Sequence, residues 1–187
     1  MKQIVLASAS PRRKELLEEM DIAFIVDPSG SEENIDESLS PLEIAATLSL
    51  QKAQVVAKRH KNALVIGADT IVVLGKKILG KPKTKAHAKE MLSLLSGKAH
   101  DVITGFTIID TDTGKKVTKA VTTKVYFKKI TQEEKDAYVA TGEPMDKAGA
   151  YAIQERGSFF IEKIEGDFDN VVGLPLFAVK DVLSQFG

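Results

Sequence analysis

The stretch from Ala63 to Leu74 constrains the fold more than any other part of the chain, because it is apolar at nearly every position. A continuous apolar run of this kind predicts a strand that is buried in a sheet. Asp69 and Thr70 are its polar interruption. Strand-like and helix-like segments alternate on either side, without a linker, an internal repeat or a low-complexity segment. The sequence therefore predicts a mixed α/β fold with a sizeable, partly antiparallel sheet.

Periodicity and capping signals place the remaining elements. Further strands are predicted at residues 3–7, 23–26, 102–110, 116–127, 151–153 and 159–164. Helices are predicted after Ser10, from the capping box at Ser40 to about His60, from Thr84 to Gly97, from the capping box at Thr131 to Gly142, and from Pro175. Gly75 begins a hairpin turn, and Gly80-Lys81-Pro82 forms a second, rigid turn. Residues 1–187 are expected to form one domain.

The composition excludes several classes of function. The 187 residues include 26 basic and 26 acidic side chains, and this zero net charge disfavours sequence-independent nucleic-acid binding. Aromatic residues make up only 6% and Trp is absent, which argues against base-stacking platforms. Without cysteine there is no disulfide and no thiolate chemistry. No signal peptide and no apolar run of roughly 20 residues is evident. We therefore expect a cytoplasmic protein without nucleic-acid or membrane partners.

The segment from Leu6 to Leu17 predicts a strand, a tight turn and a helix. Ser10 is a typical N-cap residue, and proline fits the first helical position that follows it. A helix N-terminus favours acidic side chains, yet this first turn carries three cations, Arg12, Arg13 and Lys14. Amide donors, the hydroxyls of Ser8 and Ser10 and these cations predict an anion site for phosphates. The alternative is a solvated basic turn.

Two charges in apolar surroundings supply further candidates. Lys52 falls in the middle of the apolar stripe of the helix that begins at Ser40. Its ammonium either reaches water at the edge of the core or points into a cleft to meet an anion. Asp69 interrupts the buried run, and an unpaired buried carboxylate is costly. Asp69 therefore needs a metal, a cation or hydrogen-bond donors as its partner, and the simplest alternative is an aspartate that caps a turn.

Five short motifs resemble the signatures of the Maf family of nucleoside triphosphate pyrophosphatases, in family order and spacing. They are Ala7-Ser8-Ala9-Ser10-Pro11-Arg12-Arg13, Gly67-Ala68-Asp69-Thr70, Gly80-Lys81-Pro82, Lys147-Ala148-Gly149-Ala150-Tyr151 with Ile153-Gln154, and Gly166-Asp167 with Val172-Gly173-Leu174-Pro175. The resemblance covers essentially the whole chain. It implies an elongated mixed sheet flanked by helices, with two lobes around a central cleft, similar to inosine triphosphate pyrophosphatases.

The resemblance also implies a site, position by position. Asp69 matches the family's catalytic base, and Lys52 and Lys81 match cations that act on the triphosphate. The substrate-binding positions fall on Ser8, Arg12, Arg13, Thr70 and Gln154, of which Arg12, Thr70 and Gln154 are similar to the branch acting on dTTP and UTP. A divalent cation, Mg²⁺ or Mn²⁺, would be held by Glu33 and Asp69.

The implied reaction is hydrolysis of a nucleoside triphosphate, dTTP or UTP above all, to the monophosphate and pyrophosphate. It would serve nucleotide-pool housekeeping or be linked to arrest of septum formation and cell division. The alternative is a nucleotide-binding regulator of septum formation without turnover, which would use the same cations but would not need Asp69. A homodimer is compatible with the sequence, which leaves the oligomeric state open.

Overall fold

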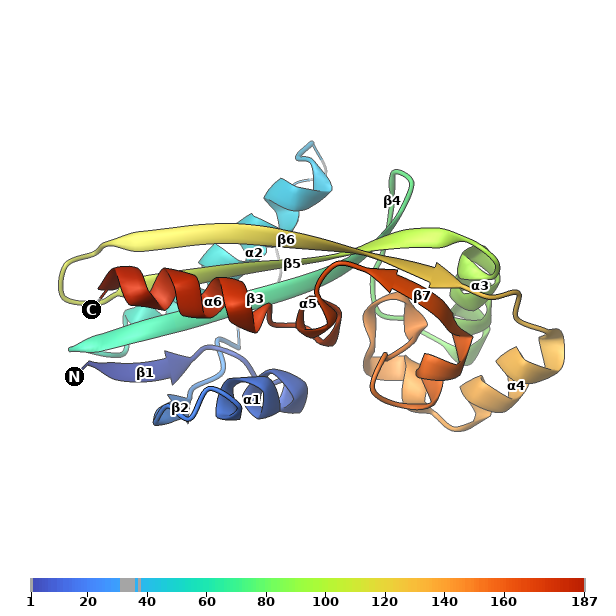
Figure 1. The fold of residues 1–187 in the computed structure, drawn as a ribbon, viewed down its shortest axis with the longest axis horizontal. Coiled ribbons are helices and arrows are strands. Elements are labelled where there is room, and N and C mark those ends of the chain that lie inside the picture. Colours follow the sequence, from blue (N-terminus) through green and yellow to red (C-terminus); the bar gives the residue numbers. More distant parts are fainter. Residues whose placement is uncertain (1, 31–35, 37, 187) are drawn as a thin grey trace. The chain divides into compact units, whose positions relative to one another are not determined.

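The computed structural model describes residues 2–30, 36 and 38–186, and these residues contain a seven-stranded mixed sheet. The strand order is β2-β1-β3-β5-β6-β7, with β4 paired to β3 (Figure 1). The strands are β1 (Gln3–Leu6), β2 (Phe24–Val26), β3 (Ala63–Leu74), β4 (Lys77–Leu79), β5 (Ala99–Asp110), β6 (Lys116–Phe127) and β7 (Ile161–Glu165). β1 is parallel to both β2 and β3, whereas the β3–β4 and β6–β7 pairs are antiparallel. The predicted mixed α/β fold is confirmed.

Six α-helices lie among the described residues, and capping explains where several begin. They are α1 (Pro11–Glu18), α2 (Pro41–Ala57), α3 (Lys85–Leu95), α4 (Gln132–Ala140), α5 (Phe168–Val172) and α6 (Leu176–Leu183). At the start of α2 both bonds of the predicted capping box are present, since Ser40 accepts from the amide of Glu43 and the Glu43 carboxylate accepts from the amide of Ser40. Among the described residues, no helix combines the length and apolar character that crossing a membrane requires.

The chain divides into two compact units. The first contains Met1–Thr70, Thr104–Val121 and Gly173–Gly187, and the second contains Ile71–Ile103 and Thr122–Val172. Each unit has an apolar core of its own. The first core packs β1, β3 and α2 residues such as Val5, Val65 and Val56, and the second is built around Leu92, Phe127 and Phe160. The expected single domain with two lobes around a cleft stays a prediction.

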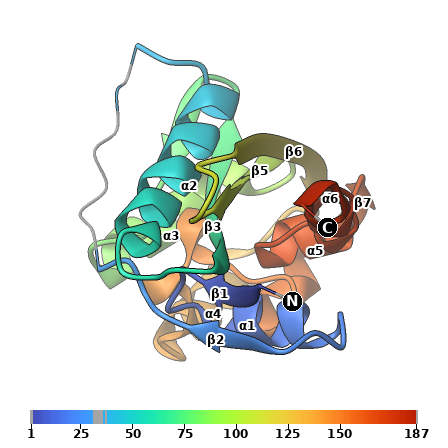
Figure 2. The same cartoon turned by 90° about the vertical axis from the view of Figure 1, so that its left-hand side faces the viewer.

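In the first unit, α2 lies directly against the sheet, as Figure 2 shows. Two glycines make this close approach feasible. A Cβ atom on Gly67 of β3 would lie 2.5 Å from the carbonyl oxygen of Ser49, and one on Gly105 of β5 would lie 2.1 Å from that of Ala45. Any larger residue would push the helix away from the strands. The glycines thus fix the distance between the α2 backbone and β3, which carries Asp69.

The structure corrects three predicted elements. Residues 151–153 form no strand, because the backbone takes left-handed φ angles at Gly149 (+69°) and Ala150 (+63°) and then enters an irregular loop. Their apolar side chains are buried without strand pairing. The strand predicted at residues 159–164 begins at Ile161, after the 3-10 helix Arg156–Phe160. The helix expected to reach about His60 ends at Ala57. The hairpin at Gly75 is confirmed, since β3 and β4 pair across it.

Candidate active site

Ser8 organises the turn between β1 and α1. Its side chain is buried, and its hydroxyl accepts hydrogen bonds from the amide of Ser10 at 3.2 Å and from the Nη1 atom of Arg13 at 3.2 Å. Ser10 holds the N-cap position of α1 as predicted, but its side chain makes no capping bond. The short turn is therefore closed by the hydroxyl of Ser8 rather than by that of Ser10.

Arg13 connects three segments of the first unit. Its guanidinium donates to the hydroxyl of Ser8, to the hydroxyl of Thr70 at 3.0 Å, and through Nε to the carbonyl of Gly173 at 2.8 Å. Thr70 in turn shares a 2.8 Å hydrogen bond with the hydroxyl of Thr104. Three of the predicted substrate-binding residues, Ser8, Arg13 and Thr70, are thus brought together, and their role in binding remains a prediction.

Gly173 and Thr104 belong to this network although the sequence analysis gave neither a role. Gly173 has a φ of +134°, a conformation that side chains rarely adopt. A Cβ atom there would lie 3.5 Å from both the Nε of Arg13 and the hydroxyl of Thr70. The one signal in the sequence is a glycine within the motif that precedes the last helix. Thr104 sits within an apolar strand and gives no comparable signal.

Lys52 on α2 and Asp69 on β3 form an ion pair. Their side chains are 15% and 8% exposed, respectively. The expectation that Asp69 has a partner is therefore confirmed, and the partner includes a cation. The ammonium of Lys52 thus meets the carboxylate of Asp69 within the protein. Whether it also faces a cleft and an anionic ligand stays a prediction. The mutual attraction offsets part of the desolvation cost of placing both charges in the protein.

Asp69 and Thr70 are consecutive on β3, so their side chains leave the strand on opposite faces. Asp69 shares its face with Gly67 and meets α2, whereas Thr70 meets Arg13 from α1. The first unit therefore presents two groups of predicted site residues. One is the Lys52–Asp69 pair, and the other is the Ser8–Arg13–Thr70 network.

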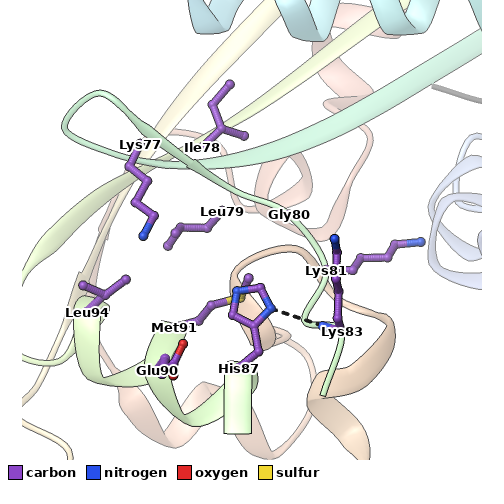
Figure 3. A pocket seen from close by; sticks show the side chains of 10 residues that line it. All are labelled: Lys77, Ile78, Leu79, Gly80, Lys81, Lys83, His87, Glu90, Met91 and Leu94. Atoms are coloured by element: carbon purple, nitrogen blue, oxygen red, sulfur yellow. Dashed lines mark hydrogen bonds between the residues drawn. The ribbon is translucent and has the colours of Figure 1, made fainter. Parts of the chain in front are cut away.

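Two further predicted residues lie in the second unit. Lys81 is exposed and follows Gly80, whose carbonyl accepts a hydrogen bond from the amide of Gly149 at 3.1 Å. Gln154 is also exposed. Figure 3 shows Lys81 and Lys83 beside the start of α3, where the amide of Lys83 donates to the ring of His87 at 3.3 Å. This basic turn lines a cavity of about 250 Å³ between β4 and α3.

The remaining predictions concern Arg12, Glu33 and the metal. Arg12 is half-buried in the first turn of α1. Glu33 lies outside the described residues. Within the described part of the chain, no cluster of three or more His, Asp or Glu side chains could hold a metal ion. Asp69 is the predicted metal ligand that the structure describes, and its carboxylate is buried. Magnesium is commonly held by one or two carboxylates together with substrate phosphates. The carboxylate of Asp69 is a ligand of this kind.

Comparison with known proteins identifies the family. The model of the Maf family, described as Maf-like protein, matches residues 3–186, and the chain belongs to this family. A relative from Bacillus mycoides is 52% identical over 100% of this chain and 96% of its own length. A relative from Methanosarcina barkeri is 50% identical over 100% and 95%, and one from Desulforamulus reducens is 49% identical over 100% and 98%. All three are named dTTP/UTP pyrophosphatase.

Among solved structures, the Staphylococcus aureus Ham1 protein aligns with 67% of this chain and 72% of that chain. The TM-score is 0.47 and the sequence identity is 17%, which is too remote to bear on the site.

Proposed function

We propose that this chain hydrolyses dTTP and UTP to the corresponding monophosphate and pyrophosphate. The observation that carries the proposal is the ion pair of Lys52 and Asp69, because it places a carboxylate and an ammonium together among largely buried residues of one unit. Relatives that are about half identical over the full chain and are named dTTP/UTP pyrophosphatase support the choice of substrate.

The chemistry needs a base and a set of cations. A water molecule attacks the α phosphorus, its proton passes to the carboxylate of Asp69, and the bond to the β phosphate breaks with its electrons on pyrophosphate. Lys52 lies beside that carboxylate and can stabilise negative charge on the phosphate oxygens as it develops. Arg13 and the turn at Ser8 would position phosphate groups.

The family resemblance implies that two residues of the second unit also contact the substrate. Lys81 would neutralise phosphate charge, and Gln154 would contact the base. A divalent cation, held by Asp69 and by Glu33, would supply charge neutralisation for the leaving pyrophosphate when bound. The cytoplasmic location, the link to septum formation and a homodimer stay predictions.

A substrate panel tests the proposal. The purified chain is incubated with Mg²⁺ and with dTTP, UTP, CTP, ATP or GTP in turn, and released pyrophosphate and monophosphate are measured. We expect fast release from dTTP and UTP and slow release from the other three. Faster turnover of purine triphosphates would remove the substrate assignment and keep the reaction class. Saturable binding of dTTP without any pyrophosphate release would instead favour the regulator without turnover.

A further inference from the structure

Lys147 is a buried lysine in the second unit, only 6% exposed, that the proposed reaction does not use. Its ammonium donates to the backbone carbonyl of Glu143 at 2.8 Å and to the carboxylate of Asp146 at 2.9 Å, and lies 3.5 Å from the carboxylate of Glu155. A buried ammonium is tolerated only with such compensation, because its desolvation is costly. The three oxygens therefore fix Lys147, and Lys147 in turn ties Glu155 to the 3-10 helix Glu143–Asp146.

Glu155 immediately follows Gln154, and the loop around Gln154 is closed at a second point. The carboxylate of Glu143 accepts from the amide of Gly157 at 3.1 Å and from the hydroxyl of Tyr138 at 2.9 Å. Burial and the neighbouring Glu143 carboxylate hold the pKa of Tyr138 well above its usual range, so this hydroxyl stays a donor.

Gly157 brings the two ends of this loop together. A Cβ atom on Gly157 would lie 2.6 Å from the carbonyl oxygen of Ala152, so only glycine permits the approach. The two ends of the loop that carries Gln154 therefore lie close together. Contacts with Glu143 and Lys147 hold its C-terminal end in place.

The same lysine begins the turn that reaches Lys81. The carbonyl of Lys147 accepts from the amide of Ala150 at 3.1 Å, and the amide of Gly149 donates to the carbonyl of Gly80. Ala150 is held at a φ of +63°, in the left-handed region that a residue with a side chain rarely adopts. Such strain persists only where the surroundings determine the backbone, and it is concentrated at functional sites. Lys147 thus stands at the junction of the Gln154 loop and the Lys81 turn.

We propose that Lys147 is a positioning residue that fixes the Gln154 loop and thereby the choice of base. The proposal rests on the proposed function. A glutamine amide presents one donor and one acceptor and can flip, so Gln154 by itself cannot separate the imide edge of thymine or uracil from the reversed polarity of cytosine. A base is rejected strongly only when the polarity of the site is fixed. Lys147 holds Glu155, the residue next to Gln154, and so fixes the backbone whose groups can orient the Gln154 amide, without itself touching substrate.

The experiment compares dTTP with CTP in three variants. Lys147→Met removes the ammonium and keeps the apolar stem, and Glu155→Gln weakens the same link from the exposed side. Lys163→Met is the matched control, because Lys163 pairs with Glu165 on the surface of the same unit. We expect the ratio of kcat/KM for dTTP over CTP to fall roughly 10- to 100-fold in Lys147→Met. The ratio should fall less in Glu155→Gln and stay unchanged in Lys163→Met.

A double variant separates positioning from a merely structural role. If Lys147 acts through Gln154, Lys147→Met combined with Gln154→Ala should lose no more selectivity than Gln154→Ala alone. Additive losses of selectivity would overturn the proposal, as would a wild-type ratio in both Lys147→Met and Glu155→Gln. Should Lys147→Met melt at the assay temperature, the ratio in Glu155→Gln decides.

Failure of the proposed role of Lys147 can be told apart from failure of the proposed hydrolase function. If the wild-type chain releases no pyrophosphate, the hydrolase proposal fails, and the same variants are then compared by equilibrium binding of dTTP and CTP. A binding preference that disappears in Glu155→Gln and Lys147→Met would support positioning by Lys147. A preference that is unchanged in both would overturn it.

Discussion

The ammonium of Lys52 and the carboxylate of Asp69 meet within the first unit, one from α2 and the other from β3. Neither group is positioned by its own secondary structure element alone. Gly67 lets the α2 backbone approach β3, and the two-residue period of the strand turns Asp69 to the same face. The close packing of α2 on β3 therefore determines that the two charges meet.

Asp69→Asn should abolish turnover and retain most of the nucleotide affinity, because the shape is kept and the basicity is lost. The loss of an acid–base group costs about 10²- to 10⁴-fold in rate. Asp110→Asn is the matched control, since Asp110 is equally buried at 8% exposure and also pairs with a lysine, Lys2. Pyrophosphate release and equilibrium binding of dTTP measure the effect. Near-normal turnover in Asp69→Asn would remove Asp69 from the mechanism.

Lys52→Met should lower both activity and stability. Lys52 lies on an apolar stripe, but the methionine would leave the largely buried Asp69 carboxylate without its ammonium. Removing one partner of a buried pair costs about 3 kcal/mol at the lower end, which is a fall in Tm of roughly 6–12 °C for a domain of this size. The double variant with Asp69→Asn should recover part of that loss. Thermal unfolding provides the measurement, and a Tm that stays low in the double variant would contradict this account.

Arg13→Lys should raise KM and destabilise the first unit although it keeps the charge. Lysine cannot reproduce the planar fork by which Arg13 reaches Ser8, Thr70 and Gly173 together. Loss of hydrogen bonds from a charged donor costs about 1.5–3 kcal/mol. Lys119→Met, which removes an exposed cation paired with Asp181, serves as the control. Wild-type KM and wild-type unfolding free energy in Arg13→Lys would show that the fork has no role.

Stability should fall as the pH is lowered from about 6.5 to 4, because His100 is buried. Burial lowers its pKa to about 4, and the ring bonds the hydroxyl of Tyr151 at 2.7 Å. The unfolded chain binds the proton near pH 6.5 and the folded chain only near pH 4, so the stability present above pH 6.5 is lost as the pH falls. The shift corresponds to about 3 kcal/mol.

Denaturant unfolding at pH 7, 6, 5 and 4 measures this contribution. His100→Gln keeps a hydrogen-bonding group for Tyr151 and removes the titration, so its unfolding free energy should vary less over this range. An equal slope in His100→Gln and the wild-type chain would assign the pH dependence to other groups.

Much of the fold follows from local sequence signals. The capping boxes at Ser40 and Thr131 and the turn at Gly75 depend on interactions between residues that are close in the chain. The apolar run at 63–74 is recognised from consecutive residues, although its strand pairs with distant segments. The strand predicted at residues 151–153 is absent for a reason that is not local to those residues. Their apolar character reflects burial in the second unit, while left-handed angles at Gly149 and Ala150 prevent strand pairing.

The sequence by itself determined the mixed α/β class, the family and the residue types that a phosphate site needs. Only the tertiary structure decided which of these residues meet. Arg13 donates to the carbonyl of Gly173, 160 residues away, and Asp69 pairs with a lysine on α2. The ammonium of Lys147 lies beside the carboxylate of Glu155, the residue that follows Gln154. The physical reason is that capping and periodicity act over a few residues. The partner of a buried charge depends instead on how closely separate elements pack, as Gly67 and Gly105 determine for α2.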